Sequence, residues 1–80
     1  MPHLNVRMYA GRSDAEKREL ADRLTQVVTE TLGYGDEAVS VAIEDVAPKD
    51  WMGGVYRTDI AAHPDRLFKR PGYGPLADED

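Results

Sequence analysis

Three consecutive stretches of the sequence decide the fold: LNVRMY (residues 4–9), SDAEKRELADRLTQVVTETLG (residues 13–33) and VSVAI (residues 39–43). In the first and third stretches apolar and polar side chains alternate, which is typical of strands with one buried face. The inward-facing residues are expected to be Leu4, Val6 and Met8 in the first strand and Val39, Val41 and Ile43 in the second. The chain therefore begins with two strands on either side of a longer middle stretch.

The middle stretch predicts a long amphipathic helix. Ser13 and Glu16 have the spacing of a capping box, in which the serine hydroxyl accepts the amide of the glutamate and the carboxylate reaches back. Apolar residues then recur at helical spacing, at Leu20, Leu24, Val27, Val28 and Leu32. Gly33 and Gly35 are expected to end the helix.

This strand–helix–strand order indicates an α/β fold with two parallel strands and a long crossover helix. About thirty residues lie between the strands, which is the length that a crossover between parallel strands needs. Two parallel strands cannot form a buried sheet alone. We therefore expect a homodimer, in which two copies join across a two-fold axis into a four-stranded sheet with helices on one face. A hexamer is the alternative.

The remaining residues predict a short C-terminal helix and loops. The pair Gly53-Gly54 favours a tight turn or short hairpin over a helix interior. Pro64 is expected to begin a short helix at its first position. Residues 71–75 are expected to form a loop, and residues 76–80 an acidic tail that frays. Residues 1–80 are predicted to form a single domain, since a chain of this length holds one core.

Composition excludes several classes of function. The chain has 10 Lys and Arg against 15 Asp and Glu, a net charge of −5, which argues against binding nucleic acid or an anionic membrane. It has no cysteine, which fits a cytoplasmic protein and removes thiolate chemistry. No stretch predicts a membrane span or a signal peptide. Two histidines sixty residues apart do not have metal-ligand spacing, so no metal or other cofactor is expected.

Pro2 is the candidate catalytic residue. If Met1 is removed, the chain begins with a secondary amine whose lone pair is not delocalised into an amide. Burial and a nearby cation both disfavour the charged form of such an amine, which moves its pKa toward the range of a general base. Proline is nevertheless a common residue, and Pro2 alone says little.

Arg12 and Trp51 are the candidate binding residues. Arg12 precedes the predicted helix, where a guanidinium and the free amides of the first turn would together attract a carboxylate or an enolate. A solvated turn arginine is the ordinary alternative. Trp51 lies beside two glycines and suits a pocket wall, although core packing is the commoner role of a lone tryptophan.

These features resemble the tautomerase superfamily, typified by 4-oxalocrotonate tautomerase. The run Pro2-His3-Leu4-Asn5-Val6, followed by Gly11-Arg12-Ser13-Asp14-Ala15-Glu16-Lys17, is similar to the opening of that family. The tail Phe68-Lys69-Arg70-Pro71-Gly72-Tyr73 looks like that of the longer, PptA-type tautomerases, which also begin Met-Pro-His. The resemblance covers nearly the whole chain.

The resemblance implies a cofactor-independent tautomerase acting on a small 2-oxo or 2-hydroxy-dienoate-type carboxylate. Pro2 matches the family's catalytic proline, Arg12 its carboxylate-binding arginine, and Trp51 an aromatic residue that keeps the pocket apolar. Ser40 aligns with a second substrate arginine, which this chain lacks. That departure favours a monocarboxylate with an aromatic or apolar tail over a dicarboxylate.

Two other functions remain open. A dehalogenase or hydratase of the same superfamily would keep the proline protonated and use another acid to activate water. A non-catalytic dimeric module that binds a small carboxylate would keep Arg12 and tolerate a retained Met1. A pH–rate profile separates the first from a tautomerase, and intact mass spectrometry separates the second.

Overall fold

The computed structural model describes residues 1–77, and these divide into two compact units, Met1–Pro48 and the segment that begins at Lys49. Each unit is described by itself. The first contains strand β1 (His3–Tyr9), helix α1 (Asp14–Leu32), a 3-10 turn η1 (Asp36–Ala38) and strand β2 (Ser40–Val46). The second contains a π-helix, η3 (Met52–Ala61), and a 3-10 turn, η4 (Pro64–Arg66), with the 3-10 turn η2 (Pro48–Asp50) at the junction.

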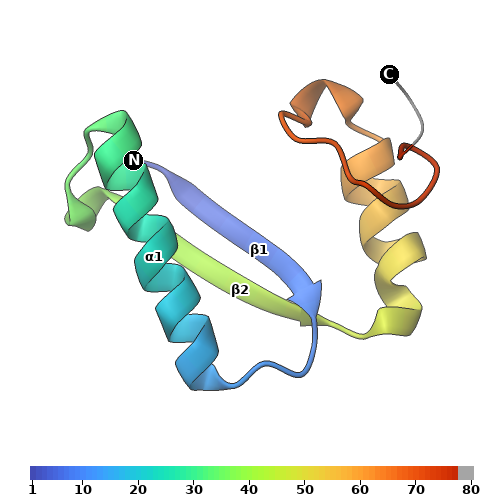
Figure 1. Ribbon diagram of the computed structural model, residues 1–80, viewed down its shortest axis with the longest axis horizontal. Helices are drawn as coiled ribbons and strands as arrows, with labels where there is room; N and C mark the ends of the chain where they lie inside the picture. The colour runs from blue at the N-terminus through green and yellow to red at the C-terminus, as the bar shows by residue number, and fades with distance from the viewer. Residues whose placement is uncertain (78–80) are drawn as a thin grey trace. The chain divides into compact units, whose positions relative to one another are not determined.

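The first unit is the predicted β-α-β arrangement (Figure 1). Strands β1 and β2 are parallel and pair in a register that sets His3 opposite Ser40 and Tyr9 opposite Val46. The ladder continues past both ends, since the Ser40 amide donates to the Pro2 carbonyl (3.2 Å) and the Ala10 amide to the Val46 carbonyl (3.0 Å). Strand β2 begins one residue later than predicted and runs three residues further, because pairing with all of β1 extends it.

Both ends of α1 form as the sequence predicts. The Ser13 hydroxyl accepts the Glu16 amide (3.1 Å), and the Glu16 carboxylate accepts the Ser13 amide (3.1 Å), which completes the capping box. Gly33 ends the helix in the left-handed conformation, with φ of 81°, where a side chain would be strained. The local signals at the two caps therefore determine where this helix begins and ends.

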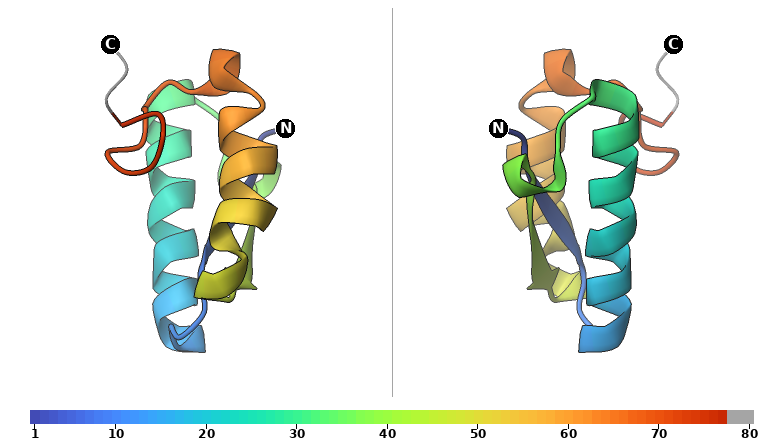
Figure 2. Two further views of the ribbon diagram at one scale, coloured as in Figure 1. Left: turned by 90° about the vertical axis from the view of Figure 1, so that its right-hand side faces the viewer. Right: turned by 90° about the vertical axis from the view of Figure 1, so that its left-hand side faces the viewer.

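Helix α1 covers one face of the two-stranded sheet (Figure 2). Met8 of β1 and Leu20 of α1 line a common pocket, and Lys17 of α1 forms an ion pair with Asp45 of β2 (2.8 Å). Because side chains alternate along a strand, the other side chains on this face are Leu4, Val6, Val41 and Ile43.

The opposite face of the sheet carries cross-strand polar pairs. His3 Nδ1 and Ser40 Oγ are 2.6 Å apart, and Arg7 Nε lies 2.9 Å from a carboxylate oxygen of Glu44. Both pairs join residues that the register sets directly opposite one another. His3 and Arg7 of β1 are thus each matched by a polar or charged partner on β2, a kind of cross-strand pair that stabilises a sheet.

The first unit leaves much apolar surface uncovered. No residue of α1 is buried, and Val27 and Leu32, both members of the predicted apolar stripe, are 58% and 61% exposed. Within Met1–Pro48, all of which the structure describes, Val46 is the one hydrophobic residue that is buried. Each strand also pairs along one edge and leaves the other open. A two-stranded sheet with so small a core is marginal on its own.

In the second unit the prediction of a turn or hairpin at Gly53-Gly54 is wrong, because both glycines lie inside the π-helix η3. The helix buries Val55 and Tyr56, which are 4% and 2% exposed. Burial of these two side chains outweighs the weak helix propensity of the glycines. Pro64 does begin a short helical turn, as predicted.

Residues 71–77 fold back onto the π-helix. The Tyr56 hydroxyl donates to the Tyr73 carbonyl (3.0 Å) and accepts the Leu76 amide (2.9 Å), and the two tyrosine rings meet edge to face at 5.3 Å. Gly74 has φ of +75°, and a Cβ there would lie 2.7 Å from the Tyr56 ring. Leu76, the first residue of the predicted acidic tail, is half-buried, while residues 78–80 lie outside the described residues.

Candidate active site

Pro2, His3 and Ser40 lie together where both strands begin. The Pro2 carbonyl accepts the Ser40 amide, so the residue is held in the sheet although it precedes β1. Pro2 is half-buried and His3 and Ser40 are exposed. Met1 is 91% exposed, and the Pro2 nitrogen belongs to the Met1–Pro2 peptide bond. Removal of Met1 would turn this nitrogen into an amine at a fixed position on the sheet.

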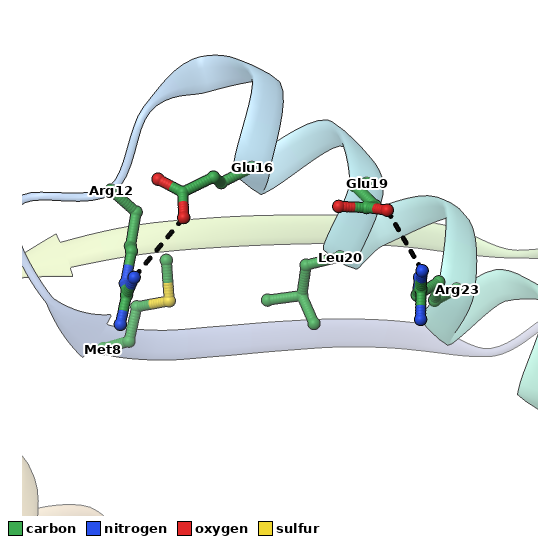
Figure 3. Close-up of a pocket in the computed structure, with 6 residues that line it drawn as sticks. All are labelled: Met8, Arg12, Glu16, Glu19, Leu20 and Arg23. Carbon is green, nitrogen blue, oxygen red and sulfur yellow. Dashed lines mark hydrogen bonds and ion pairs between the residues drawn. The ribbon is translucent and has the colours of Figure 1, made fainter.

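Arg12 lies at the other end of β1, just before α1. It lines a pocket of about 400 Å³ together with Met8, Leu20, Glu16, Glu19 and Arg23 (Figure 3). Arg12 pairs with Glu16, and Arg23 pairs with Glu19. The Arg12 side chain is 67% exposed, and its guanidinium lies 3.3 Å from the Glu16 carboxylate. The pocket therefore has an apolar floor formed by Met8 and Leu20 and a rim of two arginine–glutamate pairs.

Glu16 contacts both Arg12 and the N-cap residue Ser13. Hydrogen bonds from the Ser13 amide and then from the Ser13 hydroxyl hold the pKa of Glu16 below its ordinary value of 4.5, and the charge of Arg12 lowers it further. Glu16 is therefore ionised near neutral pH and partly offsets the positive charge of Arg12. A substrate carboxylate that binds Arg12 has to compete with Glu16 or share the guanidinium with it.

Pro2 and Arg12 are not neighbours within one chain. Seven residues of extended strand separate them, which corresponds to about 23 Å at the rise of a β-strand. One copy of the first unit therefore holds a proline site at one end of β1 and an arginine site at the other. Of the predicted site residues, the structure brings together Pro2 and Ser40.

Trp51 belongs to the second unit, immediately before η3. Its indole N–H donates to the Tyr73 hydroxyl at 2.8 Å. The Tyr73 ring contacts Tyr56, so the indole is linked to the side chain at the centre of this unit. Within the tail motif, Tyr73 is thus the residue that contacts Trp51.

Sequence reasoning assigned His3 no role, because a lone histidine on a strand is most often structural or solvated. Its contact with Ser40 depends on the strand register, which no single stretch of sequence displays. A signal was nevertheless present: His3 directly precedes the first predicted strand and Ser40 is the second residue of the other, so both lie near the starts of strands predicted to be parallel. Such positions lie side by side when the strands start level.

Residues 1–77 include neither a candidate membrane-spanning helix nor a candidate metal-binding cluster. No helix there is both long and apolar enough to cross a membrane. No three His, Cys, Asp or Glu side chains of that part gather in an arrangement that could hold a metal ion.

A family model and several known proteins with similar sequences identify the tautomerases as relatives of this chain. Residues 2–59 match the family model described as tautomerase enzyme. A probable tautomerase of Xylella fastidiosa is 53% identical over 96% of this chain and 94% of its own length, and tautomerase PptA of Cronobacter sakazakii is 42% identical over 91% and 97%.

A solved structure supports the same relationship. TomN, a 4-oxalocrotonate tautomerase homologue of the tomaymycin biosynthetic pathway, is 34% identical, with a TM-score of 0.62 over 80% of this chain and 95% of that protein. The shared fold is the β-α-β arrangement with two parallel strands. On sequence and structure together, this chain belongs to the tautomerase family.

Proposed function

We propose that this protein is a cofactor-independent keto–enol tautomerase that uses the amino nitrogen of Pro2, after removal of Met1, as its base and acid. Its substrate is a small 2-oxo or 2-hydroxy-dienoate-type carboxylate. The observation that carries the proposal is the attachment of Pro2 to the sheet: its carbonyl accepts the Ser40 amide at 3.2 Å, which holds the adjacent nitrogen in one place. A general base has to be positioned in this way before its pKa matters.

The proton transfer needs one nitrogen and a conjugated substrate. The neutral Pro2 amine takes the proton of the enol hydroxyl, the C–O bond becomes a carbonyl, and the electron pair moves through the conjugated system to a carbon. The protonated amine then returns the proton to that carbon. The reverse sequence converts ketone to enol, and the amine ends each cycle neutral. A cation near the carboxylate orients the substrate and stabilises the enolate charge.

The cation in this proposal is Arg12 of a second copy. About 23 Å of strand separates Pro2 from Arg12 of the same chain. If two β1 strands pair antiparallel across a two-fold axis, the end of one strand lies beside the beginning of the other. This arrangement would bring Arg12 of one copy close to Pro2 of its partner and would create two equivalent sites.

The surface of the first unit supports such a pairing. The outer edge of β1 is open, and the exposed side chains of Val27 and Leu32 leave part of the α1 stripe without cover. A second copy would extend the sheet to four strands and cover apolar surface on both helices. A dimer is the smallest assembly that would extend the sheet and cover this apolar surface, and a hexamer built from three such dimers would do the same.

A mixing experiment tests the catalytic and the two-copy parts of the proposal together. Intact mass spectrometry first establishes that Met1 is absent. Pro2→Ala, which keeps a small residue after Met1, and Arg12→Gln should each lose most turnover of an enolpyruvate or a 2-hydroxymuconate. Arg18→Gln, on the exposed surface of α1, is the matched control and should keep normal turnover.

The two inactive variants are then unfolded, mixed and refolded. If Pro2 and Arg12 of different copies form one site, random pairing makes half of the dimers mixed, and each mixed dimer has one intact site, so about a quarter of the activity should return. If both residues acted within one chain, every site would remain defective and no activity would return. Unchanged turnover by Pro2→Ala would refute the role of the proline itself.

A further inference from the structure

The contact between His3 and Ser40 lies beside Pro2 and takes no part in the proton transfer at the Pro2 nitrogen. The two residues stand opposite each other in the register, their side chains are 2.6 Å apart, and Ser40 also donates its amide to the Pro2 carbonyl. The same serine therefore holds both the backbone of Pro2 and the imidazole of the next residue. The His3 ring is exposed, with Nε2 on the side of the imidazole away from Nδ1 and Ser40.

This end of the sheet has no permanent cation of its own. The first four residues of each strand, His3–Val6 and Ser40–Ile43, include neither lysine nor arginine. Arg7, the next residue of β1, forms an ion pair with Glu44. Apart from the amino group of a processed chain, the ionisable group at the start of the two strands is the imidazole of His3.

A neutral imidazole held by a hydroxyl can serve either kind of hydrogen-bonding partner. When the serine O–H donates to Nδ1, the proton of the ring is on Nε2, which then donates. When Nδ1–H donates to the serine oxygen, Nε2 accepts. Protonation makes both nitrogens donors and adds the positive charge that a carboxylate needs.

We propose that His3, oriented by Ser40, binds the second polar group of the substrate, at the end opposite the carboxylate held by Arg12. The assignment rests on the proposed function. It makes the pair a determinant of specificity: a neutral hydroxyl or carbonyl is bound by neutral His3, whereas a second carboxylate is bound well only when His3 is protonated. The enzyme therefore favours monocarboxylates with a neutral polar group at neutral pH and accepts dicarboxylates better in mild acid.

Other ionisable groups near His3 have to be separated from it in any test. Along the strands these are Arg7 and Glu44, which pair with each other four positions away. Asp36 and Glu37 lie in η1, shortly before Ser40, and the Pro2 amine is the neighbouring residue. The neutral Pro2 amine is the base for both substrates, so the loss of this base on protonation cancels in a ratio of two substrates measured at one pH, and His3→Gln shows any pH dependence of the ratio that the charge of the amine leaves.

The experiment measures kcat/KM for 2-hydroxymuconate, a dicarboxylate, and for hydroxyphenylenolpyruvate, a monocarboxylate with a neutral hydroxyl, between about pH 5.5 and 8. In the unmodified enzyme the dicarboxylate-to-monocarboxylate ratio should rise at least about fivefold toward low pH. In His3→Gln, which keeps an amide for hydrogen bonding and cannot ionise, the ratio should become independent of pH. Ser40→Ala should raise KM for the monocarboxylate more than it lowers kcat.

His63→Gln is the matched control, because it removes the other histidine, in the second unit, and should leave the ratio and its pH dependence unchanged. A ratio that does not vary with pH in the unmodified enzyme, or that varies equally in His3→Gln, would overturn the role of His3 while the tautomerase function stands. Failure of the processed enzyme to convert either substrate would overturn the proposed function, and with it this inference.

Discussion

Gly74→Ala should destabilise the second unit, because both the backbone conformation of Gly74 and the space around it are unfavourable for a Cβ atom. The backbone of Gly74 has φ of +75°, where an alanine costs about 1 kcal/mol. The added Cβ would also lie 2.7 Å from two atoms of the Tyr56 ring and 2.8 Å from its hydroxyl oxygen. Tyr56 is 2% exposed, so the ring has little room to move away.

The overpacking part of this cost is typically about 1–3 kcal/mol. Together with the backbone part, Gly74→Ala should lower the free energy of unfolding by about 2–4 kcal/mol. Some loss of the hydrogen bond from the Tyr56 hydroxyl to the Tyr73 carbonyl is included in this range, because any shift of the loop lengthens it. For a domain of this size the change corresponds to at least about 8 °C in the unfolding midpoint.

The assay is urea unfolding followed by tryptophan fluorescence at one fixed protein concentration, since an oligomer's stability depends on concentration. Trp51 is the single tryptophan of the chain and belongs to the same unit as Gly74. Gly72→Ala is the matched control: a Cβ at Gly72 meets no atom within 4 Å, and its φ lies outside the left-handed range. It should change the free energy by less than about 0.5 kcal/mol.

A double-mutant cycle separates the two causes. In a Tyr56→Leu background the ring atoms that meet the new Cβ are gone, so Gly74→Ala should then cost only the backbone part, about 1 kcal/mol. Equal stability of Gly74→Ala and Gly72→Ala would refute the reasoning. An undiminished cost in the Tyr56→Leu background would show that the ring contact is not the cause.

Three further outcomes are expected. Ser13→Ala removes the helix cap and should lower stability by about 1 kcal/mol in thermal unfolding, whereas Ser13→Asp, another good cap, should keep most of it. Because the pKa of Glu16 is lowered in the folded state, its stabilising contribution is present above pH 4.5 and is lost as pH falls through the depressed value. The difference in urea midpoint between the unmodified protein and Glu16→Gln should therefore shrink in acid, and a difference that grows there would contradict this sign. Tyr73→Phe removes the acceptor of the Trp51 indole N–H and should shift the Trp51 emission maximum at a cost of about 1 kcal/mol; identical emission spectra would mean that the bond is not made in solution.

The strand–helix–strand core was predictable because each of its signals is local. Alternation at residues 4–9, the capping box of Ser13 and Glu16, and the glycine at position 33 each act through neighbours within a few residues along the chain. The π-helix was not predictable in the same way. Gly53 and Gly54 favour a turn, and only the burial of Val55 and Tyr56 among residues distant in sequence keeps them helical.

In the candidate site, too, some features could be identified from the sequence and others depend on the tertiary structure. Pro2 and Arg12 stand out in the sequence by residue type and by the motif around them, and the chemistry proposed for them follows from a free amine and a guanidinium. Their separation along β1, and hence the proposed need for a second copy, follows from the geometry of an extended strand. The pairing of His3 with Ser40 depends on the register between two strands that are far apart in the chain.

The sequence by itself determined the elements of the first unit, their order and the identity of the ionisable groups, because periodicity, capping and composition are properties of short segments. The tertiary structure decided which of those groups meet: Ser40 with Pro2 and His3 at one end of the sheet, and Arg12 with Glu16 at the other. The physical reason is that strand pairing and packing are interactions between residues far apart in the chain, and their free energy belongs to the assembled fold rather than to any one segment.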